Sequence, residues 1–209
     1  MGRSSLLTKS LALAEEMGDS LAYSNVKYVL LNDLATALYG VLRPLGEIRI
    51  LVEAGREVEV SKTIASVSKA SIPDIELASA LRDRGVAAVN MATIPLLVVD
   101  VEKTSLDSDL LKQAEDHLIS GFKVKIPPLE GLVARLLAQG QYPYIAQALT
   151  LLVAWVDAID GRELAEALRK GGVDTVLLRK QLEGLKRVLG GFPNLAGKKA
   201  LLDSLTENL

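Results

Sequence analysis

The stretch from Val26 to Glu53 constrains the fold most, because its pattern changes from helical to extended over a short span. Apolar residues first recur at helical spacing, and Gly40 ends that short helix. From Glu47 to Glu53, apolar and charged residues alternate, so Glu47 and Arg49 share the face opposite the apolar one. We therefore expect a helix followed by a strand with a buried apolar face and a charged face.

Composition bounds the class of protein. The chain has 209 residues, of which 49% are hydrophobic and 24% charged, which is typical of a globular protein with one compact domain or two small ones. Cysteine is absent, which excludes disulfides and thiolate metal sites. No apolar run approaches the roughly 20 residues that span a bilayer, and a net charge of −2 gives no general attraction to nucleic acid. We expect a cytoplasmic protein without a membrane partner.

Turn residues and periodicity predict the order of elements in the first part of the chain. Helices are expected at 4–18, 61–70, from Pro73 to Gly85, and at 105–119. Strands are expected at 47–53, 57–60, 86–91, 94–101 and 122–126. The Pro127–Pro128 pair then breaks the chain, and we place a domain boundary there, between residues 1–126 and 127–209.

The second part of the chain carries only helical patterns. They cover 129–139, 143–156, 161–170, 174–189 and 195–206. Asp160 and Asp174 are suitable N-caps for two of these helices. The expected fold class is therefore α/β (or α+β), with a small mixed sheet flanked by helices and followed by a C-terminal helical domain.

Three segments carry a resemblance to a known family. They are YVLL-Asn32-Asp33-LATALYG, the basic turn at Arg43 with the strand EIRILVE, and LLVV-Asp100-VE. Together they resemble the minimal nucleotidyltransferases of the polymerase-beta-like superfamily, which includes the toxin-type nucleotidyltransferases of abortive-infection systems. The resemblance covers roughly residues 25–140 and implies a nucleotidyltransferase-type α/β domain at 1–126.

The resemblance also implies a site, from which this chain departs. In the family, a glycine pair lets the backbone approach the nucleotide phosphates, and three carboxylates hold two Mg²⁺ ions. Here Asn32–Asp33 replaces the glycine pair, and Arg43 is the basic residue near the phosphates. Of the three acid positions, Glu47 and Asp100 remain acidic, whereas Arg49 replaces the second acid. The resemblance therefore implies a degenerate catalytic and metal site.

We hypothesise that Arg49 substitutes for the missing ion and neutralises Glu47 and Asp100 in a partly buried cleft, since arginine often binds carboxylates in a bidentate manner. Other interpretations remain open. The charged strand face is equally explained as a solvated surface, Asn32–Asp33 as a cap of the following helix, and Arg43 as a surface turn. The single histidine, His117, is expected at a solvated helix end.

Three functions are consistent with these patterns. The leading one is a non-catalytic binding or regulatory protein without a cofactor, which pairs with itself or a paralogue and retains a nucleotide site. The alternative is a Mg²⁺-dependent nucleotidyltransferase that transfers a nucleoside monophosphate to RNA, protein or a small molecule. In that enzyme Glu47 and Asp100 would bind the ion, and Asp33 or Glu53 would supply the missing third ligand. The third is an interaction domain unrelated to nucleotides. Acids interleave the late basic residues, so we expect no nucleic-acid partner. A mean hydropathy of +0.27 favours a homo-oligomer, such as a dimer.

Overall fold

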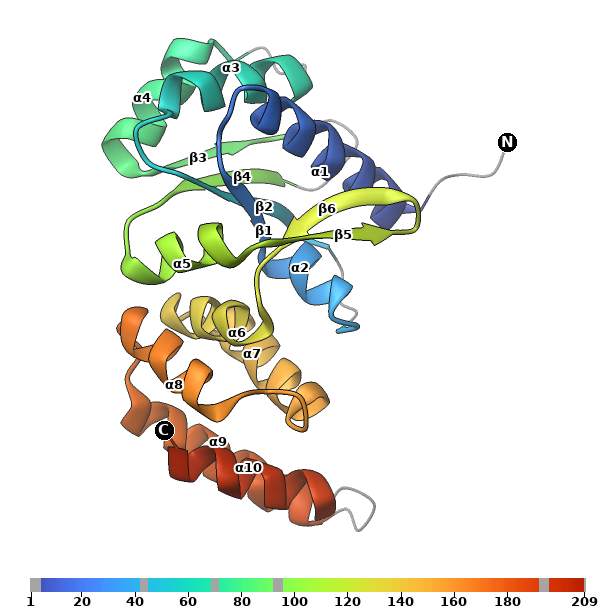
Figure 1. Ribbon diagram of the computed structural model, residues 1–209, viewed down its shortest axis with the longest axis vertical. Coiled ribbons are helices and arrows are strands. Elements are labelled where there is room, and N and C mark those ends of the chain that lie inside the picture. Colours follow the sequence, from blue (N-terminus) through green and yellow to red (C-terminus); the bar gives the residue numbers. More distant parts are fainter. Residues whose placement is uncertain (1–4, 42–44, 69–71, 92–95, 192–195, 209) are drawn as a thin grey trace. The chain divides into compact units, whose positions relative to one another are not determined.

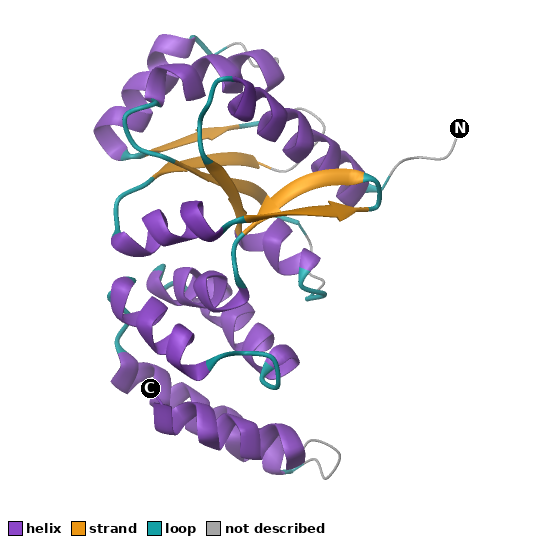
Figure 2. Ribbon diagram, in the orientation of Figure 1, coloured by secondary structure: helices purple, strands orange, loops and turns teal. Residues whose placement is uncertain are grey.

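The computed structural model describes residues 5–41, 45–68, 72–91, 96–191 and 196–208. The chain divides into two compact units, Met1–Pro128 and Leu129–Leu209. The first unit contains all the strands among the described residues together with helices, and the second contains helices alone, as Figure 2 shows. The predicted fold class, a small mixed sheet with flanking helices followed by a helical region, is confirmed.

A four-stranded mixed sheet forms the centre of the first unit (Figure 1). Its strands, in the spatial order β1-β2-β4-β3, are β1 (Tyr28–Leu31), β2 (Glu47–Val52), β4 (Leu96–Val101) and β3 (Val86–Val89). β2 runs antiparallel to β1 and parallel to β4, and β3 runs antiparallel to β4. β4 is almost wholly buried, which is why its sequence is a nearly continuous apolar run, whereas β2 alternates because Glu47 and Arg49 are only partly buried.

Helices cover both faces of this sheet. They are α1 (Leu6–Tyr23), α2 (Asn32–Leu38), α3 (Glu57–Ser68), α4 (Asp74–Arg84) and α5 (Ser105–Gln113). In Figure 1, α1, α3 and α4 lie on one side of the sheet, and α2 and α5 lie on the other. α4 ends at Gly85 in the left-handed conformation, as expected from the sequence.

A separate hairpin, β5 (Glu115–Ile119) and β6 (Phe122–Ile126), packs through β6 against α1 and β1. Its two-residue turn has positive φ at Ser120 (51°) and Gly121 (87°), which suits the twist of a tight hairpin. The expected strand at 122–126 is confirmed, but the expected helix at 105–119 is wrong beyond Gln113. His117 therefore lies in a strand and not at a helix end.

Two further expectations about the first unit are wrong. Residues 57–60 begin α3 and do not form a strand, because Val60, Ile64 and Val67 recur at helical spacing and are buried. α1 does not end at Gly18 but continues to Tyr23. A side chain at Gly18 would collide with the phenol of Tyr28, so this glycine serves the close approach of α1 to β1.

The second unit consists of α6 (Leu129–Ala138), α7 (Tyr142–Trp155), α8 (Gly161–Lys170), α9 (Thr175–Gly190) and α10 (Ala196–Asn208). α6 packs against α7 and α8, and α10 packs against α8 and α9. Asp160 and Asp174 accept backbone N–H groups at the starts of α8 and α9, so both predicted caps are confirmed. No helix in the described part of the chain has the length and apolar character needed to cross a membrane.

Candidate functional site

The charged face of β2 meets the carboxyl end of β4 on one face of the sheet. Glu47 and Arg49 are two residues apart on β2 and therefore point the same way. Arg49 pairs across the sheet with Val98, and Asp100 lies two residues further along β4 on the same face. The two strands are neighbours, so the long side chain of Arg49 can reach both acids.

Arg49 donates hydrogen bonds to both carboxylates. Its Nε lies 2.8 Å from Glu47 Oε1, and its second terminal nitrogen lies 3.1 Å from Glu47 Oε2, which is a bidentate pair. Its first terminal nitrogen lies 3.0 Å and 3.3 Å from the two oxygens of Asp100. One guanidinium therefore joins the acids of two adjacent strands. We call Glu47, Arg49 and Asp100 the arginine cluster.

The arginine cluster is largely removed from water. The side chains of Arg49, Glu47 and Asp100 are 17%, 12% and 10% exposed. Burial alone lowers the pKa of the Arg49 guanidinium, but the hydrogen bond to Glu47 and the charge of Asp100 outweigh burial and raise that pKa above its ordinary value. Arg49 is consequently a fixed positive charge under any physiological condition.

Asn32 adds a second donor to the same carboxylate. It is fully buried, has a positive φ of 50°, and its Nδ2 donates to Glu47 Oε1 at 2.8 Å. Asparagine tolerates this left-handed conformation better than most residues do. α2 begins with Leu31 as its N-cap and has no side-chain cap, so the interpretation of Asn32–Asp33 as capping residues is wrong.

Asp33 holds the start of β2 in place. Its Oδ2 accepts the backbone N–H groups of Gly46, at 2.9 Å, and of Glu47, at 3.3 Å. A side chain at position 46 would crowd this oxygen, which explains the glycine there. Arg43, the third expected nucleotide-binding residue, lies outside the described residues.

The residues of the arginine cluster do not fit a magnesium ion. Mg²⁺ requires octahedral oxygen ligands at about 2.1 Å, whereas a guanidinium lies between these two carboxylates. Glu47 pairs with Leu96, four positions before Asp100, and Arg49 bridges the two acids. Across the residues that the structure describes, no group of three or more acidic, histidine or cysteine side chains could hold a metal ion.

Asp33 and Glu53, the acids expected to supply the missing metal ligand, accept hydrogen bonds from backbone N–H groups instead. Glu53 Oε1 accepts the backbone N–H of Lys27 at 3.0 Å, at the far end of β2. Asp33 binds backbone amides, as described above. The structure therefore brings Asn32, Glu47, Arg49 and Asp100 together, with Asp33 beside them, and leaves Glu53 apart. The bond from Asn32 to Glu47 was not anticipated from sequence, because it depends on the left-handed backbone of Asn32.

The chain was compared with known proteins. No protein-family model matches it, and neither does any curated protein. Solved structures to which it is similar include an antigenic nucleotidyltransferase-like protein from Paracoccidioides brasiliensis, with 13% identity, a TM-score of 0.47, and coverage of 94% of this chain and 92% of that chain.

Two structures of the antibiotic-resistance factor ANT(2'')-Ia are also similar to this chain. The solution structure has 10% identity and a TM-score of 0.47, and covers 86% of this chain and 96% of its own. The crystal structure, a complex with adenylyl-2''-tobramycin, has 10% identity and a TM-score of 0.49, and covers 78% of this chain and 97% of its own. Of these three structures, one is described as nucleotidyltransferase-like, and the other two are of an antibiotic-resistance factor.

Proposed function

We propose that this chain is a nucleotidyltransferase-like protein in which an arginine occupies the place of the metal, and that it acts as a binding or regulatory protein without catalysis. One observation carries the proposal: the Arg49 guanidinium is hydrogen-bonded to both Glu47 and Asp100. Nucleotidyl transfer by two metal ions depends on carboxylates that bind the ions directly. Here the carboxylates already have a cation as their partner.

The charge of this cation supports a non-catalytic role. The raised pKa of Arg49 keeps it protonated, so it repels a divalent ion at any working pH. The carboxylates in turn oppose a nucleoside triphosphate that arrives without its metal. Glu47, Asp100 and Asp33 together carry more negative charge than one arginine offsets. The surroundings of the arginine cluster therefore disfavour the metal–triphosphate complex that the chemistry requires.

The binding role is proposed to use protein surfaces, with a second copy of the chain or a paralogue as partner. Large apolar side chains are exposed in both units, and they include Ile75, Leu118, Tyr142 and Val176. Such side chains are common in interfaces between proteins. Sedimentation equilibrium of the intact chain is expected to show self-association that depends on concentration.

A thermal-shift titration with each nucleoside triphosphate, with and without Mg²⁺, tests the proposal. A ligand at a hundred times its dissociation constant adds about 2.7 kcal/mol to the free energy of unfolding. We expect no stabilisation that depends on Mg²⁺. Stabilisation by a nucleotide without Mg²⁺ would support a retained nucleotide site used for sensing. Stabilisation that requires Mg²⁺ would contradict the proposal and favour the Mg²⁺-dependent enzyme.

A further inference from the structure

A second polar site lies at the opposite end of β1 from the arginine cluster. It is a groove of about 280 Å³, formed by α1, the turn after it, the start of β1, and the hairpin of β5 and β6. Tyr28 lines the groove at the first position of β1, whereas Asn32 follows the last. About 13 Å of strand separates these two residues. The groove and the arginine cluster are therefore separate sites.

Tyr28 presents a buried phenol to this groove. Its residue is 8% exposed, and its hydroxyl lies against Gly18 of α1. Burial, followed by the charges of Asp116, Asp19 and Glu15, raises its pKa to about 12, so the phenol keeps its proton. Within the part of the chain that the structure describes, no group forms a hydrogen bond with this hydroxyl. The hydroxyl borders the groove and is open to solvent there, so it can donate a hydrogen bond to an acceptor brought by a ligand.

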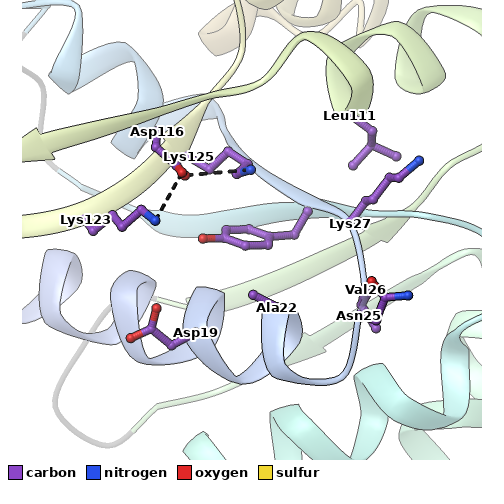
Figure 3. Close-up of a pocket in the computed structure, with 10 residues that line it drawn as sticks. Asp19, Ala22, Asn25, Val26, Lys27, Leu111, Asp116, Lys123 and Lys125 are labelled. Atoms are coloured by element: carbon purple, nitrogen blue, oxygen red, sulfur yellow. Dashed lines mark ion pairs between the residues drawn. The ribbon is translucent and has the colours of Figure 1, made fainter.

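Lysines surround the phenol. Figure 3 shows Lys123 and Lys125 of β6 directed at Asp116 of β5, with Lys27 at the other end of the groove and Asp19 on α1. Asp116 is 3.1 Å from the Lys123 ammonium and 3.7 Å from that of Lys125. The single carboxylate of Asp116 therefore pairs with two ammonium groups. These three side chains together carry one positive charge in excess.

The walls of the groove are held in place independently of any ligand. Glu15 of α1 accepts the backbone N–H of Lys123 at 2.7 Å, which ties β6 to α1. β6 also packs against β1, so the hairpin and Tyr28 keep their relative positions. A site with fixed walls loses little conformational entropy when a ligand binds.

We propose that this groove binds a small phosphomonoester, with the phosphate between Lys123, Lys125 and the Tyr28 hydroxyl. A phosphate offers only acceptors, which matches the ammonium and phenol donors, and its charge matches the excess positive charge. Asp19 then accepts a hydrogen bond from a hydroxyl of the ligand. The volume lies just below the range of about 300–1,000 Å³ that is usual for small-molecule sites, which favours a sugar- or glycerol-sized phosphate over a nucleotide.

Isothermal titration calorimetry of the intact chain with glycerol 3-phosphate, inorganic phosphate and glycerol tests this proposal. Glycerol 3-phosphate is expected to bind in the millimolar range or more tightly, inorganic phosphate more weakly, and glycerol not at all. Lys125→Gln is expected to weaken binding about tenfold, because a charge-assisted hydrogen bond is lost. Tyr28→Phe is expected to weaken it less, since only the hydroxyl is removed.

Lys180→Gln is the matched control, because it makes the same charge change on an exposed residue of α9. It is expected to leave the affinity within about twofold of the original. Circular dichroism establishes that each variant is folded. The proposal is overturned if the unmodified chain binds neither phosphate at millimolar concentration, a result that needs no variant. It is also overturned if Lys125→Gln and Tyr28→Phe bind as well as the control does.

Discussion

In the part of each unit that the structure describes, a cation with little exposure is held by two carboxylates, but the two clusters differ in where the carboxylates lie. In the α/β unit, Arg49, Glu47 and Asp100 are all mostly buried, and the bonds join adjacent strands. The cation here offsets charges that the fold itself has removed from solvent.

In the helical unit the carboxylates face water. The Lys186 side chain is 6% exposed, whereas those of Glu183 and Asp203 are 55% and 51% exposed. Lys186 Nζ lies 2.8 Å from Glu183 and 3.0 Å from Asp203, which joins α9 to α10. Burial alone lowers the pKa of Lys186, but the hydrogen bonds to Glu183 and Asp203 outweigh it and raise that pKa.

A cation between two carboxylates therefore has different energetic consequences in the two units. A buried ion pair is costly to assemble and costly to break, whereas solvated acids readily survive the loss of their cation. The arginine cluster is therefore a poor device for stability alone.

The largest expected effect is that of Arg49→Met. This change leaves two mostly buried carboxylates without the guanidinium that offsets their charge, and it should lower the free energy of unfolding by about 3–5 kcal/mol. Urea denaturation followed by circular dichroism measures the loss. Hydrogen–deuterium exchange should locate it in β2 and β4, and protection in the helical unit should be unchanged. A loss below about 1 kcal/mol would show that water reaches the cluster.

An intermediate loss of stability is expected when the pH is raised, because the phenol of Tyr28 is neutral in the folded chain and resists ionisation there. Its pKa rises from 10.0 to about 12 on folding. Between these values the unfolded chain has lost the phenol proton and the folded chain retains it, so stability is fully present below pH 10 and falls as pH rises toward 12. The loss should be at most about 2 kcal/mol, because solvent that reaches the hydroxyl weakens the effect. Denaturation curves of Tyr28→Phe should lack this component, and identical pH dependence in the two proteins would refute the prediction.

The smallest effect is expected from Lys186→Met. Methionine fills a similar volume, and the two acids remain solvated, so the free energy of unfolding should change by less than about 1 kcal/mol in either direction. The same denaturation experiment measures it beside Arg49→Met. Equal losses from the two substitutions would remove the distinction between the clusters.

Local signals predicted much of the fold. The alternation at 122–126, the glycine that ends α4, and the aspartates that cap α8 and α9 are all decided by nearby residues. The predictions for two segments were wrong, for reasons that the structure shows. At 57–60 the sequence alternates over only four residues, whereas apolar residues at helical spacing continue to Val67, and the whole segment is helical. At 115–119 the strand depends on its partner β6 and on the turn at Ser120–Gly121, so helical continuation was the wrong inference.

The site was partly predictable. Strand parity places Glu47 and Arg49 on one face, and this needs no structure. The reach of Arg49 to Asp100 depends on the register between β2 and β4, which only a family resemblance suggested. The hydrogen bond from Asn32 to Glu47 could not be predicted, because it requires the positive φ of Asn32. The groove at Tyr28 was missed, since its walls come from elements that are far apart in the sequence.

Calorimetric titration of Mg²⁺ into Arg49→Asp tests directly the proposal that Arg49 stands where a metal ion would bind. This variant restores an acid between Glu47 and Asp100, and oxygen ligands are those that Mg²⁺ prefers. We expect folded Arg49→Asp to bind Mg²⁺ and to gain thermal stability from it, whereas the unmodified chain and Arg49→Met do neither. Folded Arg49→Asp that binds no Mg²⁺, or an unmodified chain that binds it as tightly, would contradict the proposal.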